Sequence, residues 1–207
     1  MKRIGIFNDS RTCPTKSVFF ALQTVISTYP GDPFRKELSS IIGEISSSTE
    51  QKIQCEALKR GAALLASSLL YTEYCVWDYS FVKDVAHTEF SSWVDDIQRI
   101  LNAPDDKDDV APFGGAETSY MVATLVILSN HNSLKSWLQG YPANLTPPEY
   151  FLRKTIETMW NRIASPKSGI ITNCTNAMLT ISPSSADNFY SLKSLHASEW
   201  DYLKPVY

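Results

Sequence analysis

The sequence YMVATLVIL, from Tyr120 to Leu128, decides the fold of this chain. These nine residues carry no charge and are dominated by β-branched and aliphatic side chains, which is typical of a buried strand. A strand that is apolar on both faces must be covered on both, so we expect it at the centre of a sheet under helices. The stretch predicts the middle of the fold and indicates no chemistry.

Length, charge and cysteine content narrow the class of protein. The chain has 207 residues, of which 43% are hydrophobic, so one domain with a sizeable core is expected. A formal net charge of −3 offers no large positive field, which argues against nucleic acid as a partner. No apolar run approaches the roughly 18 residues of a transmembrane helix, and the N-terminus does not resemble a signal peptide. Four scattered cysteines then predict free thiols and a cytoplasmic or other reducing intracellular compartment.

Helical periodicity accounts for much of the remaining chain. Apolar side chains recur every three or four residues over 16–28, 33–45, 50–70 and 83–101, and again after Asn132. This spacing predicts amphipathic helices.

Capping and small-residue patterns support the 50–70 helix and predict a further helix after Thr146. Ser47-x-x-Glu50 and Thr146-Pro147-Pro148-Glu149 each predict a helix start, because the serine or threonine and the glutamate can satisfy each other's free backbone N–H groups. The small residues Gly61, Ala62 and Ala63 in the 50–70 helix would allow a neighbouring element to approach closely.

Short β-prone runs and two irregular segments complete the outline. Strands are expected at Lys2–Phe7 and Tyr74–Trp77, and a hairpin from the runs 169–173 and 177–181. An Asp-rich loop is expected at 103–116, because its four aspartates lack the register of a calcium loop and its glycine pair lacks a phosphate-binding context. We therefore predict a single globular α+β domain over 1–207, with about six helices packed on a small sheet centred on Tyr120 to Leu128.

Cys13 is the one candidate catalytic residue. It lies between an expected strand and an expected helix, where a helix N-terminus can stabilise a thiolate. The run Thr12-Cys13-Pro14-Thr15 resembles the peroxidatic loop of peroxiredoxins, although Lys16 replaces the glutamate of that loop and no other peroxiredoxin landmark follows. A thiol-dependent enzyme using Cys13 is one hypothesis, and a plain loop or buried thiol is the other.

No pattern predicts a metal site or a cofactor. The three histidines, His87, His131 and His196, have no second histidine and no cysteine at zinc-ligand spacing. Each is expected to be an exposed side chain or a satisfied hydrogen-bond partner.

The aromatic C-terminal tail, 194–207, contains the candidate binding residues. Trp200, Tyr202 and Tyr207 lie in this terminal segment, where exposed aromatic side chains would be typical anchors of an interface.

The order of segments is similar to that of a poorly characterised family of cyanobacteria and plastids, whose soluble α+β domain usually follows a membrane anchor. The resemblance rests on SSTEQKI through LLYTEYCVW, on SYMVATLVIL, and on the ending ASEWDYLKPVY, all between Ser47 and Tyr207. It implies a non-enzymatic role near a membrane complex and assigns no site residues.

These observations favour a non-catalytic protein-binding or assembly module, for example an accessory subunit of a larger complex. A protein partner is expected, and peripheral membrane association and homo-oligomerisation both stay open. The thiol enzyme is one alternative, and a viral or phage structural or inhibitory protein is another.

Overall fold

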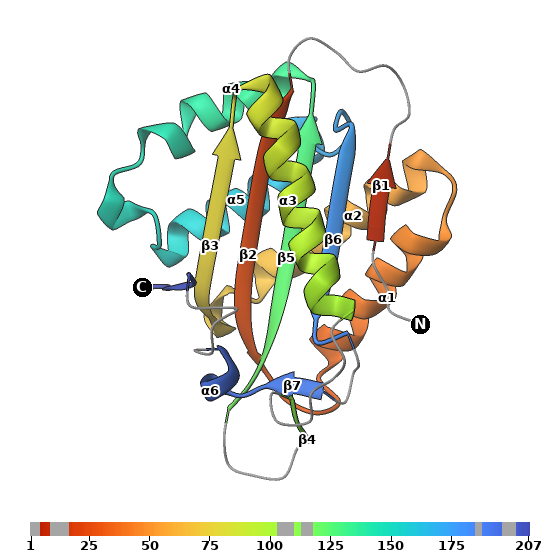
Figure 1. Ribbon diagram of the computed structural model, residues 1–207, viewed down its shortest axis with the longest axis vertical. Coiled ribbons are helices and arrows are strands. Elements are labelled where there is room, and N and C mark those ends of the chain that lie inside the picture. Colours follow the sequence, from red (N-terminus) through yellow and green to blue (C-terminus); the bar gives the residue numbers. More distant parts are fainter. Residues whose placement is uncertain (1–4, 9–16, 103–109, 113–117, 185–187, 196–201) are drawn as a thin grey trace.

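The computed structural model describes residues 5–8, 17–102, 110–112, 118–184, 188–195 and 202–207. All its strands belong to one antiparallel sheet (Figure 1). The main strand order is β1 (Gly5–Asn8), β6 (Asn176–Ser182), β5 (Ser119–Ser129), β2 (Val18–Thr28), β3 (Thr72–Ser80) and β8 (Lys204–Pro205). At one end β7 (Asn188–Tyr190) pairs with β5 and with β4 (Val110–Pro112).

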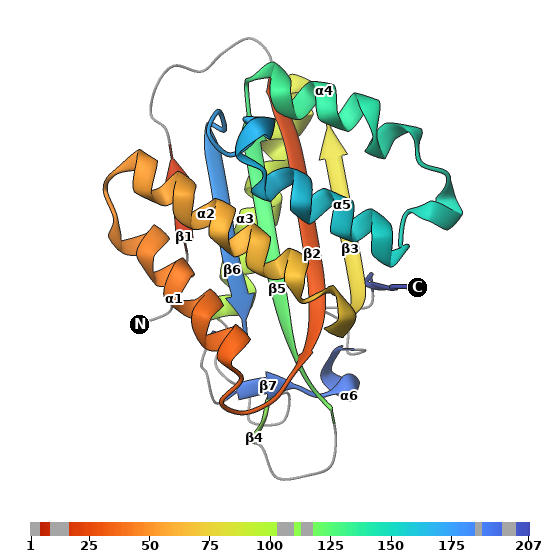
Figure 2. The same cartoon turned by 180° about the vertical axis from the view of Figure 1, so that it is seen from behind.

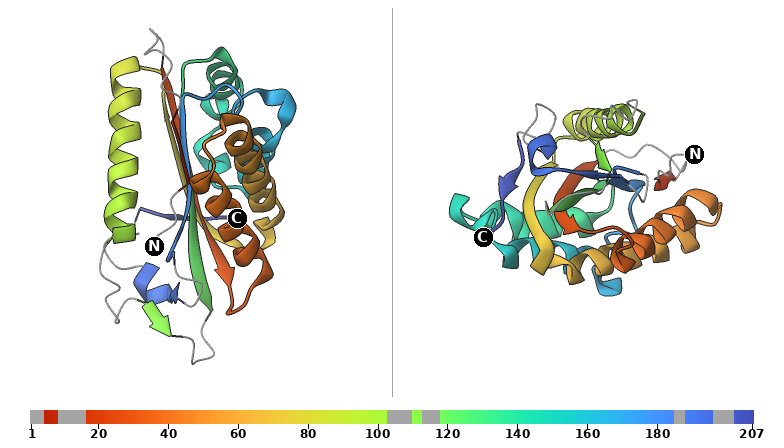
Figure 3. Two further views of the ribbon diagram at one scale, coloured as in Figure 1. Left: turned by 90° about the vertical axis from the view of Figure 1, so that its right-hand side faces the viewer. Right: turned by 90° about the horizontal axis from the view of Figure 1, so that it is seen from below.

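Helices cover the two faces of the sheet unequally. α3 (Lys83–Asn102) lies alone across one face, as the edge-on view in Figure 3 shows. The opposite face, seen in Figure 2, carries α1 (Pro33–Ser47), α2 (Gln51–Ser67), α4 (Asn132–Gly140) and α5 (Arg153–Ala164). The short helix α6 (Leu192–Leu195) follows β7, and four 3-10 turns join other elements: η1 (Leu69–Tyr71), η2 (Pro142–Asn144), η3 (Pro147–Glu149) and η4 (Pro166–Ser168).

The central strand β5 divides the core in two, as its apolar sequence predicts. Leu125 and Ile127 belong to the large cluster with α1, α2, α4 and α5, whereas Val126 and Leu128 pack in a second cluster under α3. Since alternate side chains of a strand point to opposite faces, a strand covered on both sides carries mainly apolar residues on both of them. The predicted α+β fold, with about six helices packed on a sheet centred on Tyr120 to Leu128, is confirmed, since the described residues form the helices α1 to α6.

The expected helix at 16–28 is wrong, because this segment forms β2. Its eleven residues pair with β5 over their whole length and with β3 on the other side. Ten of them are buried. Seven of its eleven residues are apolar and match helical spacing by coincidence, and pairing within the sheet decides the outcome.

Several local expectations are also corrected. The runs 169–173 and 177–181 do not form a hairpin, because the first is a turn that follows η4 and only the second lies in a strand, β6. Ser47 does not cap α2; instead the Ser48 hydroxyl accepts the backbone N–H of Glu50. Within the expected loop at 103–116, the three residues 110–112 form β4, and the aspartates lie outside the described residues.

Other expected elements are confirmed. The strands near the N-terminus and at Tyr74–Trp77 are β1 and β3, and the helices at 33–45, 50–70 and 83–101 are α1, α2 and α3, although α2 already ends at Ser67. Glu149 forms the expected capping contacts with Thr146, although they start the single turn η3 and α5 begins only at Arg153. Gly61 of α2 does face a close neighbour, because a Cβ atom there would lie 2.6 Å from Cδ2 of Leu179 in β6.

Candidate functional site

A cleft of about 240 Å³ lies between α3 and the sheet, beside the C-terminal segment. We call it the α3 cleft. Gln23 of β2 lies at its base, Glu89, Trp93 and Asp96 line it from α3, and Tyr202 lines it from the C-terminal segment. The cleft therefore combines one buried amide, two aromatic rings and two carboxylates.

Gln23 is a buried polar residue, with only 1% of its surface exposed. Its Nε2 donates to Oγ1 of Thr124, its register partner on β5, at 2.7 Å. Its Oε1 accepts the hydroxyl of Tyr202 at 2.7 Å. Burying an amide without partners costs about 1–3 kcal/mol, so these two bonds stabilise Gln23 and also hold the Tyr202 ring along the cleft.

The wall contributed by α3 is aromatic in the middle and acidic on either side. Trp93 packs against Phe19 with ring centroids 6.5 Å apart and also lines the cleft. Asp96 pairs with Arg99 at 3.5 Å, but both side chains are more than 60% exposed, so water screens this pair. Glu89 forms no ion pair with any described residue. Counting Glu89, Asp96 and Arg99, the lining carries a net charge of −1.

A second feature is an exposed apolar surface near the C-terminus, which we call the terminal patch. It consists of Leu70, Tyr71, Leu152 and Tyr207, which expose 81, 61, 39 and 74% of their surface. Arg153 holds the segments that carry these residues together. Its guanidinium donates to the carbonyl oxygens of Leu69 and Thr72, and its backbone N–H donates to the carbonyl of Tyr207 at 2.8 Å.

The backbone of the C-terminal segment is firmly hydrogen-bonded. β8 pairs with Tyr74 and Cys75 of β3, the Val206 N–H donates to the Glu73 carbonyl at 2.8 Å, and the Tyr207 N–H donates to the Phe151 carbonyl at 3.0 Å. The segment therefore closes part of an exposed sheet edge. The Tyr207 side chain is left to project from a fixed backbone.

The three predicted binding residues have different surroundings. Tyr202 points into the α3 cleft, Tyr207 belongs to the terminal patch, and Trp200 lies outside the described residues. Cys13 and His196 also lie outside them. The sequence patterns did not indicate Gln23, Leu70 or Tyr71 as site residues. A lone glutamine within an apolar strand is a usable signal, but it requires that the strand be recognised first.

Two histidines have hydrogen-bond partners, as expected. Nε2 of His87 lies 2.8 Å from Oγ of Ser17, a spacing that would suit proton transfer. Ser17 is 3% exposed, however, and no described carboxylate bonds the other ring nitrogen. His131 caps α4 by accepting the Ser133 N–H at Nδ1, and it lines an open polar hollow with Cys174. In neither place do the described residues form a complete catalytic set.

The described cysteines, Cys55, Cys75 and Cys174, are buried and form no disulfide. Sγ of Cys174 donates to the carbonyl of Ile171 at 3.0 Å. Burial raises the pKa of the Cys75 thiol to about 12, so it stays protonated at neutral pH. A protonated, buried thiol is a poor nucleophile, and these residues therefore contribute to the core.

Two further properties concern the described part of the chain as a whole. It contains no group of three or more histidine, cysteine, aspartate or glutamate side chains arranged to hold a metal ion. None of its helices is long and apolar enough to span a bilayer.

Comparison with known proteins gives no relative. No family model, no curated protein and no solved structure matches this chain. The resemblance to the cyanobacterial and plastid family stays a prediction.

Proposed function

We propose that the protein is a non-catalytic protein-binding or assembly module whose partner docks on the terminal patch. The observation that carries this proposal is that four exposed apolar side chains lie on segments joined by the hydrogen bonds of Arg153 and Tyr207: Leu70, Tyr71, Leu152 and Tyr207. Scattered exposed hydrophobic side chains are ordinary, but a contiguous group costs solvation unless a partner covers it. Tyrosines are also over-represented among residues that dominate binding energies.

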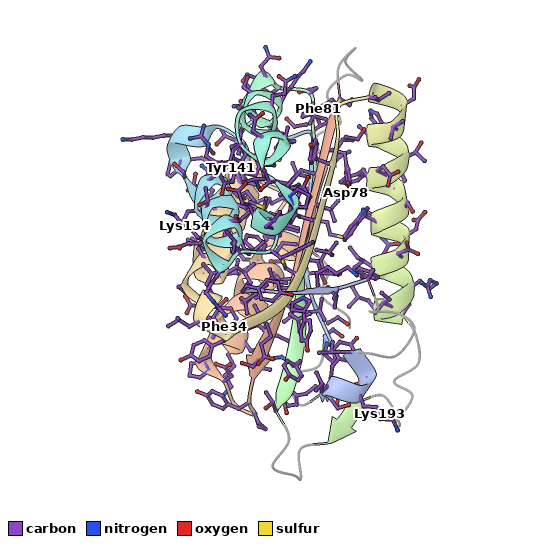
Figure 4. All side chains as sticks on the ribbon, turned by 90° about the vertical axis from the view of Figure 1, so that its left-hand side faces the viewer. Phe34, Asp78, Phe81, Tyr141, Lys154 and Lys193 are labelled. Atoms are coloured by element: carbon purple, nitrogen blue, oxygen red, sulfur yellow. The ribbon has the colours of Figure 1, made fainter. Side chains whose placement is uncertain are left out.

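The rigidity of the patch supports the same function. Arg153 and the backbone bonds of Val206 and Tyr207 fix the three segments that carry the patch, so little backbone entropy is lost when a partner binds. The exposed Lys154 and Lys204 flank it, and neither forms an ion pair with a described residue. Lys154 projects outward in Figure 4. A protein surface with an apolar centre and an acidic rim is the complementary partner.

Point variants test this proposal better than removal of the tail. Deleting 194–207 would also expose the β3 edge, so a loss of assembly could reflect misfolding. Leu70→Asp and Tyr207→Ala change exposed side chains and keep the backbone bonds. Val82→Asp is the matched control, because Val82 is 62% exposed but follows the other end of β3.

The experiment compares the native assembly of these proteins. Each is expressed at natural levels in the source cells, and the size of its complex is measured by native electrophoresis. The Leu70→Asp/Tyr207→Ala protein should migrate as a free monomer, while Val82→Asp keeps the complex. If both patch substitutions leave the complex unchanged, the proposal is wrong. Mass measurement of the purified protein identifies a second copy as the partner if it shows a patch-dependent dimer.

A further inference from the structure

We propose that the connection between α4 and α5 is a ligand for a WW domain, a small module whose aromatic groove binds proline-rich segments, and that this activity is separate from docking on the terminal patch. The connection contains the run Pro147-Pro148-Glu149-Tyr150. One class of WW domains binds the pattern Pro-Pro-x-Tyr, in which aromatic rings of the groove hold the prolines and a neighbouring pocket takes the tyrosine. The chain matches all three fixed positions of this pattern.

The motif lies on an accessible part of the surface. Figures 1 and 2 show the connection between α4 and α5 at the rim of the molecule, beyond β3. Thr146 and the three residues that follow it are exposed, and Tyr150 is half-buried. No described strand pairs with this segment. A globular domain can therefore reach the prolines without disturbing the core.

The backbone before the motif already has the conformation that a WW groove binds. Leu145 has φ −69° and ψ 149°, and Thr146 has φ −91° and ψ 155°. Both lie near the polyproline II values of about −75° and 145°. Pro148 also favours an extended conformation at Pro147, because the residue before a proline avoids the helical region. The prolines can therefore continue this conformation once the turn η3 opens.

Contacts of Glu149 and Tyr150 hold the motif in that turn. The Glu149 carboxylate accepts the backbone N–H of Thr146 at 2.8 Å and its hydroxyl at 2.6 Å, and the Glu149 carbonyl accepts the Thr155 hydroxyl at 2.7 Å. Nε1 of Trp77 donates to the Tyr150 carbonyl at 3.0 Å, and the two rings meet edge to face with centroids 5.3 Å apart. The structure is thus the closed form of the motif. A WW domain binds by opening it and taking the tyrosine into its own pocket.

Titration calorimetry of the full-length protein with a purified WW domain of the Pro-Pro-x-Tyr class tests the proposal. The domain should bind at submillimolar concentration, and the same domain with its groove tryptophan replaced by alanine should not. Pro148→Ala and Tyr150→Ala should each weaken binding at least about tenfold, because each removes a fixed position of the motif. Pro148 is exposed, so the first variant should keep its fold. Absence of binding by the natural protein at millimolar concentration, or unchanged binding by either variant, would overturn the proposal.

Two substitutions outside the fixed positions should strengthen binding, because they favour the open form. Trp77→Phe removes the N–H that Tyr150 accepts, and Glu149→Ala removes the carboxylate that bonds to Thr146. The loss of one such bond should lower the dissociation constant about three- to tenfold. Glu157→Ala removes the same charge as Glu149→Ala from an exposed position on α5, and affinity should stay within about twofold. Unchanged or weaker binding by both Trp77→Phe and Glu149→Ala would overturn the closed form.

The terminal patch provides the test that separates the two activities. The Leu70→Asp/Tyr207→Ala protein keeps the motif, so it should bind the WW domain as tightly as the natural protein does. A loss of WW binding in this variant would overturn the independence of the motif. Failure of the natural protein to bind the WW domain would leave docking on the terminal patch unaffected.

Discussion

Replacing Gly61 by alanine should destabilise the protein by about 1 kcal/mol, although the same change stabilises most helices. In an exposed helix, replacing glycine by alanine raises the free energy of unfolding by up to about 1 kcal/mol. Here the new Cβ would lie 2.6 Å from Cδ2 of Leu179 and 3.5 Å from Cγ2 of Ile41. Leu179 is 1% exposed and cannot move into solvent, so the core must absorb an overpacking cost of about 1–3 kcal/mol. The cost exceeds the helical gain.

Chemical denaturation followed by circular dichroism measures this difference, with Gly140→Ala as the control. A Cβ at Gly140 meets no atom within 4 Å, so this variant should be neutral or slightly more stable. A double-mutant cycle identifies the cause: Leu179→Ala alone should cost about 2–5 kcal/mol, and roughly 1 kcal/mol less when Ala occupies position 61. Stabilisation by Gly61→Ala, or strict additivity in the cycle, would refute the packing of α2 against β6 described above.

Two further predictions concern buried polar groups. Because burial raises the pKa of Cys75 from 9.0 to about 12, the unfolded chain loses this proton first as the pH rises. Stability should fall by up to about 1.4 kcal/mol per pH unit above about pH 9, and Cys75→Ala should reduce this slope by one proton; identical slopes in alkaline denaturation would contradict the assignment. Arg153→Met leaves the carbonyls of Leu69 and Thr72 without their shared donor and should cost about 2 kcal/mol. The neighbouring exposed Lys154→Met should change stability by less than about 0.5 kcal/mol, and equal effects of the two substitutions would remove the bridging role of Arg153.

The parts of the fold that were predicted correctly are those with an unambiguous local pattern. Nine uncharged residues from Tyr120 to Leu128 fit only a buried strand, and α1, α2 and α3 have a clear polar face that a helix period explains. β2 fails this test. Its buried residues face α3 on one side and the other helices on the second, and the adjacent polar residues Gln23 and Thr24 fall on opposite faces, so no polar face reveals the period.

The candidate sites depend on contacts between distant parts of the chain. Tyr202 was singled out for its terminal position, but its role in the cleft follows from the bond to Gln23, 179 residues earlier. Leu70 was assigned to the end of a core helix, whereas α2 ends at Ser67 and η1 turns Leu70 outward. Figure 4 gives a similar example, with Asp78 on the α3 side of the sheet and Tyr141 on the other side. Such placements are set by tertiary pairing and leave no periodic signal.

The most direct test of the proposed function is the size of the native complex formed by the Leu70→Asp/Tyr207→Ala protein. Both side chains are largely exposed, so the fold should persist and only the surface offered to a partner should change. A shift to the monomer, with the Val82→Asp protein still assembled, is the predicted result. An unchanged complex, in a variant whose circular dichroism and melting temperature match those of the natural protein, would contradict docking on the terminal patch.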